Sequence, residues 1–193
     1  MMQNKNLLIA ITGGIGSGKS QVSTLLKRWG YTVYSADEVY AELLSCSEFV
    51  KQIHQAVGVE DNSPALNRKA VSNAVFASPE KLAVLNNLTH SKIMERLMDL
   101  SKNKGVVFNE VPLLFEGGFE SFYDKVIVVT RPLDMRVQSV IERDGLTREE
   151  VLKRIKNQFD YAKITNTKHT VIVNDLTLQS LEDKVKVALN EIL

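Results

Sequence analysis

The sequence has a single cysteine, Cys46, so a disulfide within the monomer is excluded. Such low cysteine usage is typical of proteins in a reducing compartment, and we expect a cytoplasmic location. Cys46 comes shortly after Leu43 and Leu44 in a stretch with a helical pattern. No histidine or second cysteine lies close to it in the sequence, so we expect Cys46 to pack among apolar neighbours.

Long apolar runs are absent as well. The run at 7–11 is too short for a signal peptide, and no small-residue cleavage site follows it. No segment approaches the roughly 20 consecutive apolar residues that cross a bilayer. We expect a soluble protein without a membrane partner.

Neither sign of charge is in excess. The chain has 24 lysines and arginines against 23 aspartates and glutamates, a formal net charge of +1. This balance does not indicate nucleic acid as a partner, because nucleic-acid binding usually needs a basic excess. The histidines His54, His90 and His169 show no metal-ligand spacing, and each is expected to be structural or exposed.

The 193 residues, 44% of them hydrophobic, permit a single domain over 1–193 with a sizeable core. Short apolar runs alternate with helical patterns, which predicts an α/β fold with a five-stranded, mostly parallel sheet flanked by helices. The runs expected to form strands are 7–12, 31–34, 106–110, 125–130 and 170–173.

Two segments stand outside this alternation. The interval 37–104 is too long for one crossover helix, and it holds several helical patterns around a polar break at 58–67. It predicts a helical insertion, and insertions at strand ends commonly carry substrate recognition. The segment 131–161 is rich in arginine and is expected to form a lid. Its arginines are Arg131, Arg136, Arg143, Arg148 and Arg154.

The stretch LLIAITGGIGSGKSQ, residues 7–21, runs from a strand pattern through a glycine-rich loop into a helical pattern. Residues 13–20 match the phosphate-loop pattern G-x-x-x-x-G-K-[S/T]. The glycines let successive backbone N–H groups turn inward, and the following helix points its positive end to the same place. Lys19 adds a full charge for the β/γ-phosphates, and Ser20 is positioned to bind Mg²⁺. The expected nucleotide-binding residues here are Gly13, Gly14, Ile15, Gly16, Ser17, Gly18, Lys19, Ser20 and Gln21.

The rest of the sequence narrows the class of phosphate-loop protein. A GTP switch needs N-K-x-D and D-x-x-G loops, and the sequence has neither. A motor-type ATPase would have an apolar strand ending in paired acids, whereas the run 106–110 ends in one acid. Small P-loop kinases lack the two switch loops. They need instead an acceptor site, a base for the hydroxyl and a basic lid. The sequence therefore favours a kinase that uses ATP and Mg²⁺.

Asp37 is a candidate base for this kinase. It lies just past the second predicted strand, and ligands in open α/β sheets sit at the carboxyl ends of strands. The alternative is that Asp37 caps the next helix, and spacing alone leaves both possibilities open. In the lid, Arg136 and Arg143 are seven residues apart and share a helix face. We expect at least one lid arginine to act on the phosphate, since its planar fork can hold two oxygens at once.

Further segments resemble the dephospho-coenzyme A kinase family over nearly the whole chain. They are ITGGIGSGKS at 11–20, YSADEVYAELL at 34–44, LNRKAVSNAVF at 66–76, LNNLTHSKI at 85–93, VPLLFEGGF at 111–119, RDGLTREEVLKRIKNQ at 143–158 and VIVND at 171–175. Many unrelated proteins share the phosphate loop. P-L-L-F-E followed by R-D-G-L-T at this spacing is far more specific.

The resemblance implies that the γ-phosphoryl group of ATP moves to the ribose 3′-hydroxyl of dephospho-CoA. It implies Asp37 as the base, with Lys19 and Arg143 as charge stabilisers. It also implies that Asn174 is a candidate for the adenine pocket. The candidates for binding the acceptor are Asp37, Arg68, His90 and Glu116. We expect a monomer or a weak homo-oligomer.

The chain departs from the family pattern in the outer lid and near the adenine pocket. Ser139 stands where the family often has arginine, and Arg136 stands where it often has glutamine. Lys168 and His169 replace an alanine–aspartate pair before the last strand. Two other functions stay open: a small kinase for another nucleoside, nucleotide or small-molecule hydroxyl, and a non-catalytic ATP-binding regulatory protein.

Overall fold

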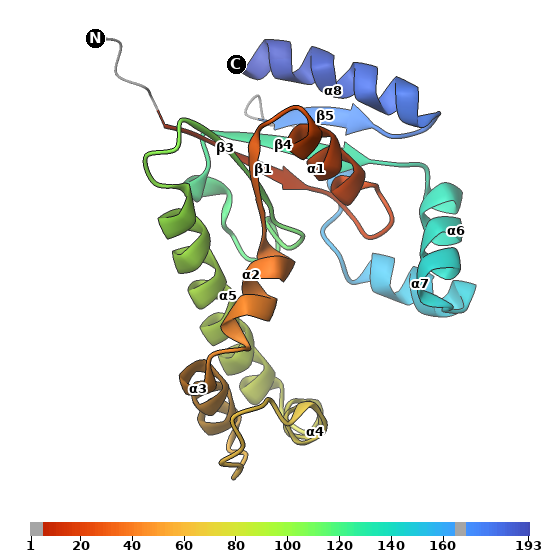
Figure 1. The fold of residues 1–193 in the computed structure, drawn as a ribbon. Helices are drawn as coiled ribbons and strands as arrows, with labels where there is room; N and C mark the ends of the chain where they lie inside the picture. The colour runs from red at the N-terminus through yellow and green to blue at the C-terminus, as the bar shows by residue number, and fades with distance from the viewer. Residues whose placement is uncertain (1–5, 165–168) are drawn as a thin grey trace. The chain divides into compact units, whose positions relative to one another are not determined.

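The structure of the protein, a computed structural model, describes residues 6–164 and 169–193 (Figure 1). Its chain divides into two compact units. One, here called the sheet unit, combines Met1–Tyr34 with Asn103–Leu193, and the other, the helical unit, is Ser35–Lys102. Lys168, one of the departures from the family pattern, lies outside the described residues.

The sheet unit is built on five strands in the order β2–β3–β1–β4–β5. The strands are β1 (Leu7–Thr12), β2 (Thr32–Ser35), β3 (Val106–Glu110), β4 (Lys125–Thr130) and β5 (His169–Val173). β1 pairs in parallel with both β3 and β4, and β4 pairs in parallel with β5. The α/β fold and the five strands expected from the sequence are confirmed, with β2 and β5 shifted by one residue at one or both ends.

Parallel pairing brings the carboxyl ends of four strands to one edge of the sheet. Ile11 of β1 lies beside Glu110 of β3, and Thr130 of β4 lies beside Val173 of β5. Residues that follow these strands therefore come together at this edge, which is where α/β proteins bind ligands.

Helices α1 (Lys19–Arg28) and α8 (Leu178–Ile192) contact each other and cover one face of the sheet (Figure 1). Alternate strand residues such as Ile9, Ile11 and Phe108 pack against apolar residues of both helices and are buried. Strands buried in this way read as nearly continuous apolar runs, which explains why their positions could be predicted.

Two further helices of the sheet unit, α6 (Leu133–Asp144) and α7 (Arg148–Lys156), pack against each other. Gly145, with φ +68°, ends α6 in the left-handed conformation that glycine favours. Thr147 and Glu150 then form a capping box that begins α7. Val137, Val140 and Val151 are buried between the two helices.

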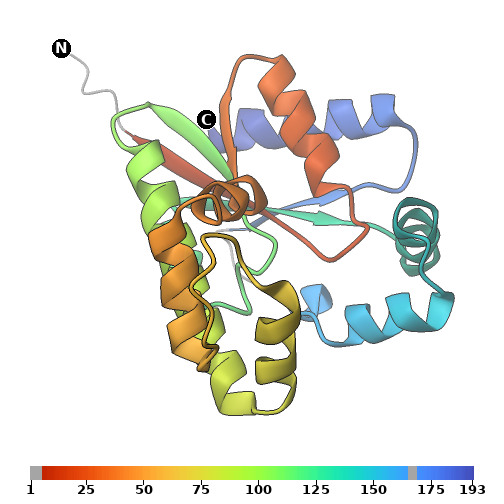
Figure 2. The same ribbon diagram turned by 60° about the horizontal axis from the view of Figure 1, so that its bottom comes forward.

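The helical unit contains α2 (Ala36–Leu43), α3 (Ser47–Val57), α4 (Arg68–Phe76) and α5 (Pro79–Ser101). Figure 2 shows α3 and α4 against the long helix α5, and α2 also contacts α5. Phe49, Ile53 and Val57 of α3 are buried in its core. Cys46, just before α3, is exposed, so the expectation that it packs among apolar residues is wrong.

No helix among the described residues is long and apolar enough to cross a membrane.

Candidate active site

The phosphate loop, residues 13–20, leaves the carboxyl end of β1 and leads into α1. Gly13 and Gly18 have φ angles of +148° and +96°, which side chains rarely permit. A Cβ atom on Gly13 would collide with the carbonyl oxygen of Val129, and one on Gly18 would collide with the side chain of Asn174. The loop therefore passes too close to β4 and to the residue after β5 for any side chain at these two positions.

Two polar side chains of the loop, Lys19 and Ser17, lie against the loop itself or are buried in it. Lys19 Nζ donates hydrogen bonds to the carbonyl oxygens of Gly13 (2.8 Å) and Gly14 (3.2 Å), so its ammonium lies over the first turn of the loop. The buried Ser17 Oγ has no hydrogen-bond partner among the described residues. Ser20, the second residue of α1, is exposed. An ammonium, a helix N-terminus and a buried hydroxyl that still needs a partner fit the phosphates of a nucleotide.

Asn174, expected in the adenine pocket, directly follows β5 and is buried. Its Nδ2 donates to the carbonyl oxygen of Ser17 (3.0 Å) and to Gln21 Oε1 (3.1 Å). Its backbone N–H donates to the carbonyl oxygen of Thr130 (2.8 Å). Asn174 therefore fastens the phosphate loop and the start of α1 to the edge of the sheet.

Arg136 of α6 and Gln158, two residues beyond α7, contact the loop at Ile15. Arg136 Nε donates to the carbonyl oxygen of Ile15 (2.9 Å), and Gln158 Oε1 accepts from the Ile15 N–H (2.8 Å). Burial lowers the pKa of Arg136, but an arginine stays protonated in proteins. The fold thus brings a positive charge from the predicted lid onto the phosphate loop.

A cavity of about 520 Å³ opens between the end of β4, α7 and the segment after α7. Its lining includes Arg131, Arg136, Lys156, Gln158, Phe159 and Tyr161. The Tyr161 hydroxyl lies 3.5 Å from Thr12 Oγ1, and burial raises the pKa of Tyr161, so the phenol is neutral at pH 7. Asp160 also lines the cavity, and three cations against this one carboxylate leave a positive excess that suits an anionic ligand.

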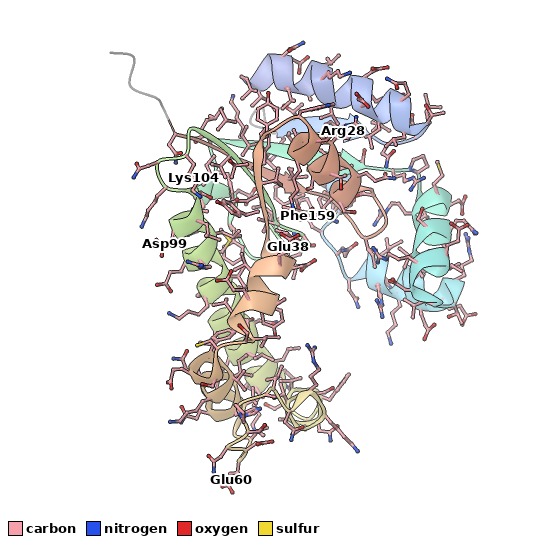
Figure 3. The ribbon with its side chains drawn as sticks, in the orientation of Figure 1. Arg28, Glu38, Glu60, Asp99, Lys104 and Phe159 are labelled. Carbon is pink, nitrogen blue, oxygen red and sulfur yellow. The ribbon has the colours of Figure 1, made fainter. Side chains whose placement is uncertain are left out.

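Glu116, expected to bind the acceptor, lies in the turns after β3. Its Oε1 accepts a hydrogen bond from the N–H of Phe159 (2.8 Å), a residue labelled in Figure 3. The rings of Phe115 and Phe159 stack with centroids 4.6 Å apart. These contacts join the segment after β3 to the segment after α7, so Glu116 already has a structural role in one wall of the cavity.

Glu110 is a candidate site residue that the sequence alone did not single out. It ends β3 beside Ile11, and its Oε2 accepts a hydrogen bond from Ser23 of α1 (2.6 Å). Ser23 is three residues beyond Ser20, so this carboxylate lies at the sheet edge from which the loop and α1 begin. The signal is present in the sequence, since a single acid ends the apolar run 106–110, but the motor-ATPase pattern requires paired acids and does not single it out.

Arg143, predicted to stabilise charge, is exposed at the end of α6. Its Nε and Nη2 donate to Asp144 Oδ1 (2.7 Å) and Oδ2 (2.9 Å), and this bonding lowers the pKa of Asp144. The described contacts therefore turn its guanidinium toward a neighbour in the chain. Arg131, another arginine of the predicted lid, donates a hydrogen bond to Ser139 Oγ (2.8 Å). Ser139 stands at the position where the family often has arginine.

Three other predicted residues belong to the helical unit. Asp37 is the second residue of α2 and is exposed, while Ser35 holds the N-cap position. The alternative in which Asp37 caps this helix is therefore wrong. Arg68 begins α4; burial raises the pKa of Tyr40, and the charge of Arg68 opposes part of that rise. His90 of α5 is half-buried, and burial lowers its pKa, so its ring is neutral at pH 7.

The parallel sheet with a phosphate loop between β1 and α1 is the fold of P-loop proteins, the class that includes the small P-loop kinases. The shikimate kinase of Acinetobacter baumannii has the same fold, with a TM-score of 0.54 and 11% identity over 98% of this chain and 94% of that one. A gluconokinase from Sinorhizobium meliloti gives a TM-score of 0.52 and 14% identity over 96% of this chain and 93% of the other. These two likenesses concern the fold alone.

Within that class, the family model for dephospho-CoA kinase matches residues 7–180, and the chain belongs to this family. Dephospho-CoA kinases of Thermus thermophilus and Fusobacterium nucleatum subsp. nucleatum are 37% and 34% identical to it. The matches cover 96% and 93% of this chain, and 92% and 95% of the relatives. A crystal structure of a Thermus thermophilus protein called TT1252 gives a TM-score of 0.80 and 36% identity, covering 97% of this chain and 98% of that one. The structure of the dephospho-CoA kinase of Campylobacter jejuni gives a TM-score of 0.68 and 26% identity, and the match covers 99% of this chain and 98% of that one.

Proposed function

We propose that this protein transfers the γ-phosphoryl group of ATP to the ribose 3′-hydroxyl of dephospho-CoA and releases CoA and ADP. This is the last step of coenzyme A synthesis. The observation that carries the proposal is the family match over 7–180 on a chain whose phosphate loop has Lys19 and Ser20 at the start of α1. The same loop alone would serve many reactions, so the acceptor rests on the family.

ATP is proposed to bind through residues 13–21. The Lys19 ammonium, the N-terminus of α1 and the unsatisfied hydroxyl of Ser17 would hold its phosphates. Mg²⁺ would neutralise charge on the β- and γ-phosphates, and the oxygens that would hold it are the Ser20 hydroxyl and the Glu110 carboxylate. Oxygen donors of this kind match the preference of Mg²⁺.

Asp37 is proposed to accept the proton of the ribose hydroxyl. An exposed carboxylate in the first turn of α2 has the charge and the freedom for this role. Arg143 is proposed to leave Asp144 and to stabilise the transferring phosphoryl group, and Arg136 already contacts the loop.

The acceptor is proposed to bind through the helical insertion 37–104 and the segment after β3, with Arg68, His90 and Glu116 as contacts. Arg68 supplies a cation for a phosphate, and a neutral His90 supplies a hydrogen bond.

The segment 131–161 is proposed to be the lid of this kinase, and Asn174 to border the adenine as well as to support the loop. The protein is proposed to act in the cytoplasm as a monomer or a weak homo-oligomer, without nucleic acid or a membrane as partner. The single cysteine and the balanced charge support this part of the proposal.

The experiment measures ADP release by the purified protein with ATP and Mg²⁺ while the acceptor is varied among dephospho-CoA, AMP, uridine and shikimate. The expected result is turnover with dephospho-CoA far above the other three, and a product that co-migrates with CoA. A Lys19→Ala protein of normal melting temperature is the control for contaminating kinases. Equal turnover with AMP would favour a nucleotide kinase, and ATP binding without turnover on any acceptor would favour a regulatory ATP-binding protein.

A further inference from the structure

Ile15, at the tip of the phosphate loop, is held by groups from outside the loop on every side. Its carbonyl oxygen accepts from Arg136 Nε, and its N–H donates to Gln158 Oε1. Its side chain packs with the buried apolar cluster between α6 and α7, which includes Val137, Val140 and Val151. Both of its peptide groups and its side chain therefore belong structurally to the α6–α7 region.

The contact continues at the next residue of the loop. A Cβ atom on Gly16 would lie 2.6 Å from the carbonyl oxygen of Arg136 and 3.0 Å from a methyl carbon of Val140. Gly16 also has a φ of +74°, so a side chain there would be strained in any case. The loop backbone thus lies directly on α6 over two successive residues.

Arg136 and Gln158 also bond to each other. Arg136 Nη2 donates to Gln158 Oε1 at 3.4 Å, and the same oxygen accepts the Ile15 N–H at 2.8 Å. Removing either side chain therefore releases the other from part of its contact, so the two act as one unit. A hydrogen bond from a charged donor such as Arg136 is stronger than one between neutral groups.

We infer that Arg136 and Gln158 are positioning residues for phosphate transfer. They fix both peptide groups of Ile15, hold the phosphate loop in the shape that receives ATP, and tie that loop to α6 and α7. The Ile15 N–H is used by Gln158, so the groups left to face the phosphates come from the rest of the loop. This inference rests on the proposed function for the nucleotide, and it concerns the loop whichever acceptor is used.

The first test uses the protein without nucleotide. Hydrogen exchange of the Ile15 amide is measured by NMR in the wild type and in Gln158→Leu, which removes the acceptor but keeps much of the side-chain volume. We expect exchange at Ile15 to be at least about tenfold faster in Gln158→Leu, because its hydrogen bond is lost. Gln158→Glu, whose carboxylate still accepts from the N–H, should restore the protection. Unchanged exchange at Ile15 in Gln158→Leu would overturn the inference.

The second test measures the dissociation constant of a non-hydrolysable ATP analogue with Mg²⁺ for Arg136→Met, Gln158→Leu and the double variant. Each single variant is expected to bind about tenfold more weakly, and the double variant no more weakly than the worse single one. Such non-additivity marks two residues that act through the same loop residue, Ile15. Independent, additive losses would overturn the inference and point to direct contact between Arg136 and a phosphate.

The matched control is Gln138→Leu on the same helix. Gln138 is exposed and bonds to Glu142 (2.7 Å) away from the loop, so its loss should change neither Ile15 exchange nor nucleotide affinity. Melting curves of all variants show whether each remains folded. A protected Ile15 in a wild type that binds no nucleotide would refute the proposed function and would leave Gln158 as a support of the loop only. Nucleotide binding with exchange insensitive to Gln158→Leu would refute the positioning role alone.

Discussion

Ser23 of α1 donates a 2.6 Å hydrogen bond to Glu110 at the end of β3. Glu110 lies beside Ile11 in the parallel pair of β3 and β1, two residues before the phosphate loop begins. Ser23 is one helical turn beyond Ser20, the proposed metal ligand. The bond therefore fixes a carboxylate beside the place where Mg²⁺ is expected to accompany the nucleotide.

The first prediction is that Glu110→Gln raises the Mg²⁺ concentration needed for half-maximal ADP release. Glutamine still accepts the hydrogen bond from Ser23, so the fold is retained, but the negative charge that attracts the cation is gone. Loss of a residue that only supports a metal ligand typically costs about 10-fold to 100-fold in affinity, and loss of a charged oxygen ligand should cost at least as much. A Mg²⁺ titration of turnover measures the change. The matched control, Ser23→Ala, keeps the carboxylate and should shift the titration less. A curve for Glu110→Gln that overlays the wild type would remove Glu110 from the metal site.

The phosphate loop could be predicted from sequence because its determinants are local. Glycines at 13 and 18 meet a backbone requirement, and the apolar run before them and the helical pattern after them identify the context. The support of the loop could not be predicted in this way. Arg136 and Gln158 contact Ile15 from 121 and 143 residues away in the chain, and no hydrophobic periodicity in the sequence indicates such a contact.

One alternative, that Asp37 caps a helix, and one expectation, that Cys46 packs among apolar residues, are wrong for physical reasons that the sequence does not show. Asp37 follows a strand and precedes an apolar pattern, as a cap would, but β2 runs one residue further than predicted and ends at Ser35, which takes the N-cap position. Cys46 shares a helical pattern with Leu43 and Leu44, yet α2 ends at Leu43 and a new helix starts at Ser47. Cys46 therefore falls in the exposed link between two helices.

The second prediction concerns Arg143. Arg143→Ala should slow turnover by about 10³ or more if the side chain leaves Asp144 and acts on the transferring phosphoryl group. Arg143→Lys keeps the charge but loses the fork, so it should remain slow. Single-turnover rates under saturating ATP measure both variants.

Arg148→Ala is the matched control for Arg143. Arg148 is an exposed lid arginine with its own ion pair, to Asp134 (2.8 Å), and exposed pairs of this kind contribute little to stability. Its loss should leave the rate within a few-fold of wild type. If Arg143→Ala turned over as fast as Arg148→Ala, the charge-stabilising role would pass to another lid arginine, and Arg136 is already placed at the loop.

The third prediction concerns His54, which is buried on α3. Its Nδ1 lies 3.2 Å from the carbonyl oxygen of Asp61, and its Nε2 accepts the N–H of Asn67 (3.1 Å), so the ring holds the polar segment that leads to α4. His54→Leu keeps the apolar volume and leaves the Asn67 N–H without this acceptor. A buried unsatisfied group costs about 1–3 kcal/mol, so the free energy of unfolding should fall by that amount.

Urea unfolding measures this loss, and Gln55→Leu, an exposed neighbour on the same helix, is the control that should change little. The affinity for an ATP analogue should stay near wild type in both variants, because the phosphate loop belongs to the sheet unit. An unfolding free energy for His54→Leu equal to that of the wild type would mean that water replaces the ring at no cost.

The last prediction concerns Asp37, for which the structure supplies an unusually close control. Asp37 and Glu38 are adjacent carboxylates in the first turn of α2, and both are exposed (Glu38 is labelled in Figure 3). Each interacts favourably with the positive end of the helix, an effect of about 0.3–1 kcal/mol that the neutral amide largely loses. Asp37→Asn and Glu38→Gln should therefore lower the free energy of unfolding by similar small amounts.

Their effects on turnover should differ, because only the carboxylate that reaches the ribose hydroxyl can take its proton. General-base catalysis contributes about 10² to 10⁴ in rate, and the loose transition state of phosphoryl transfer favours the lower end. Asp37→Asn is expected to keep its affinity for an ATP analogue and to lose about a hundredfold in turnover, while Glu38→Gln keeps both. Equal turnover in the two variants would leave Asp37 a helix-stabilising charge and no more, and the base would have to be sought among other groups of the acceptor site.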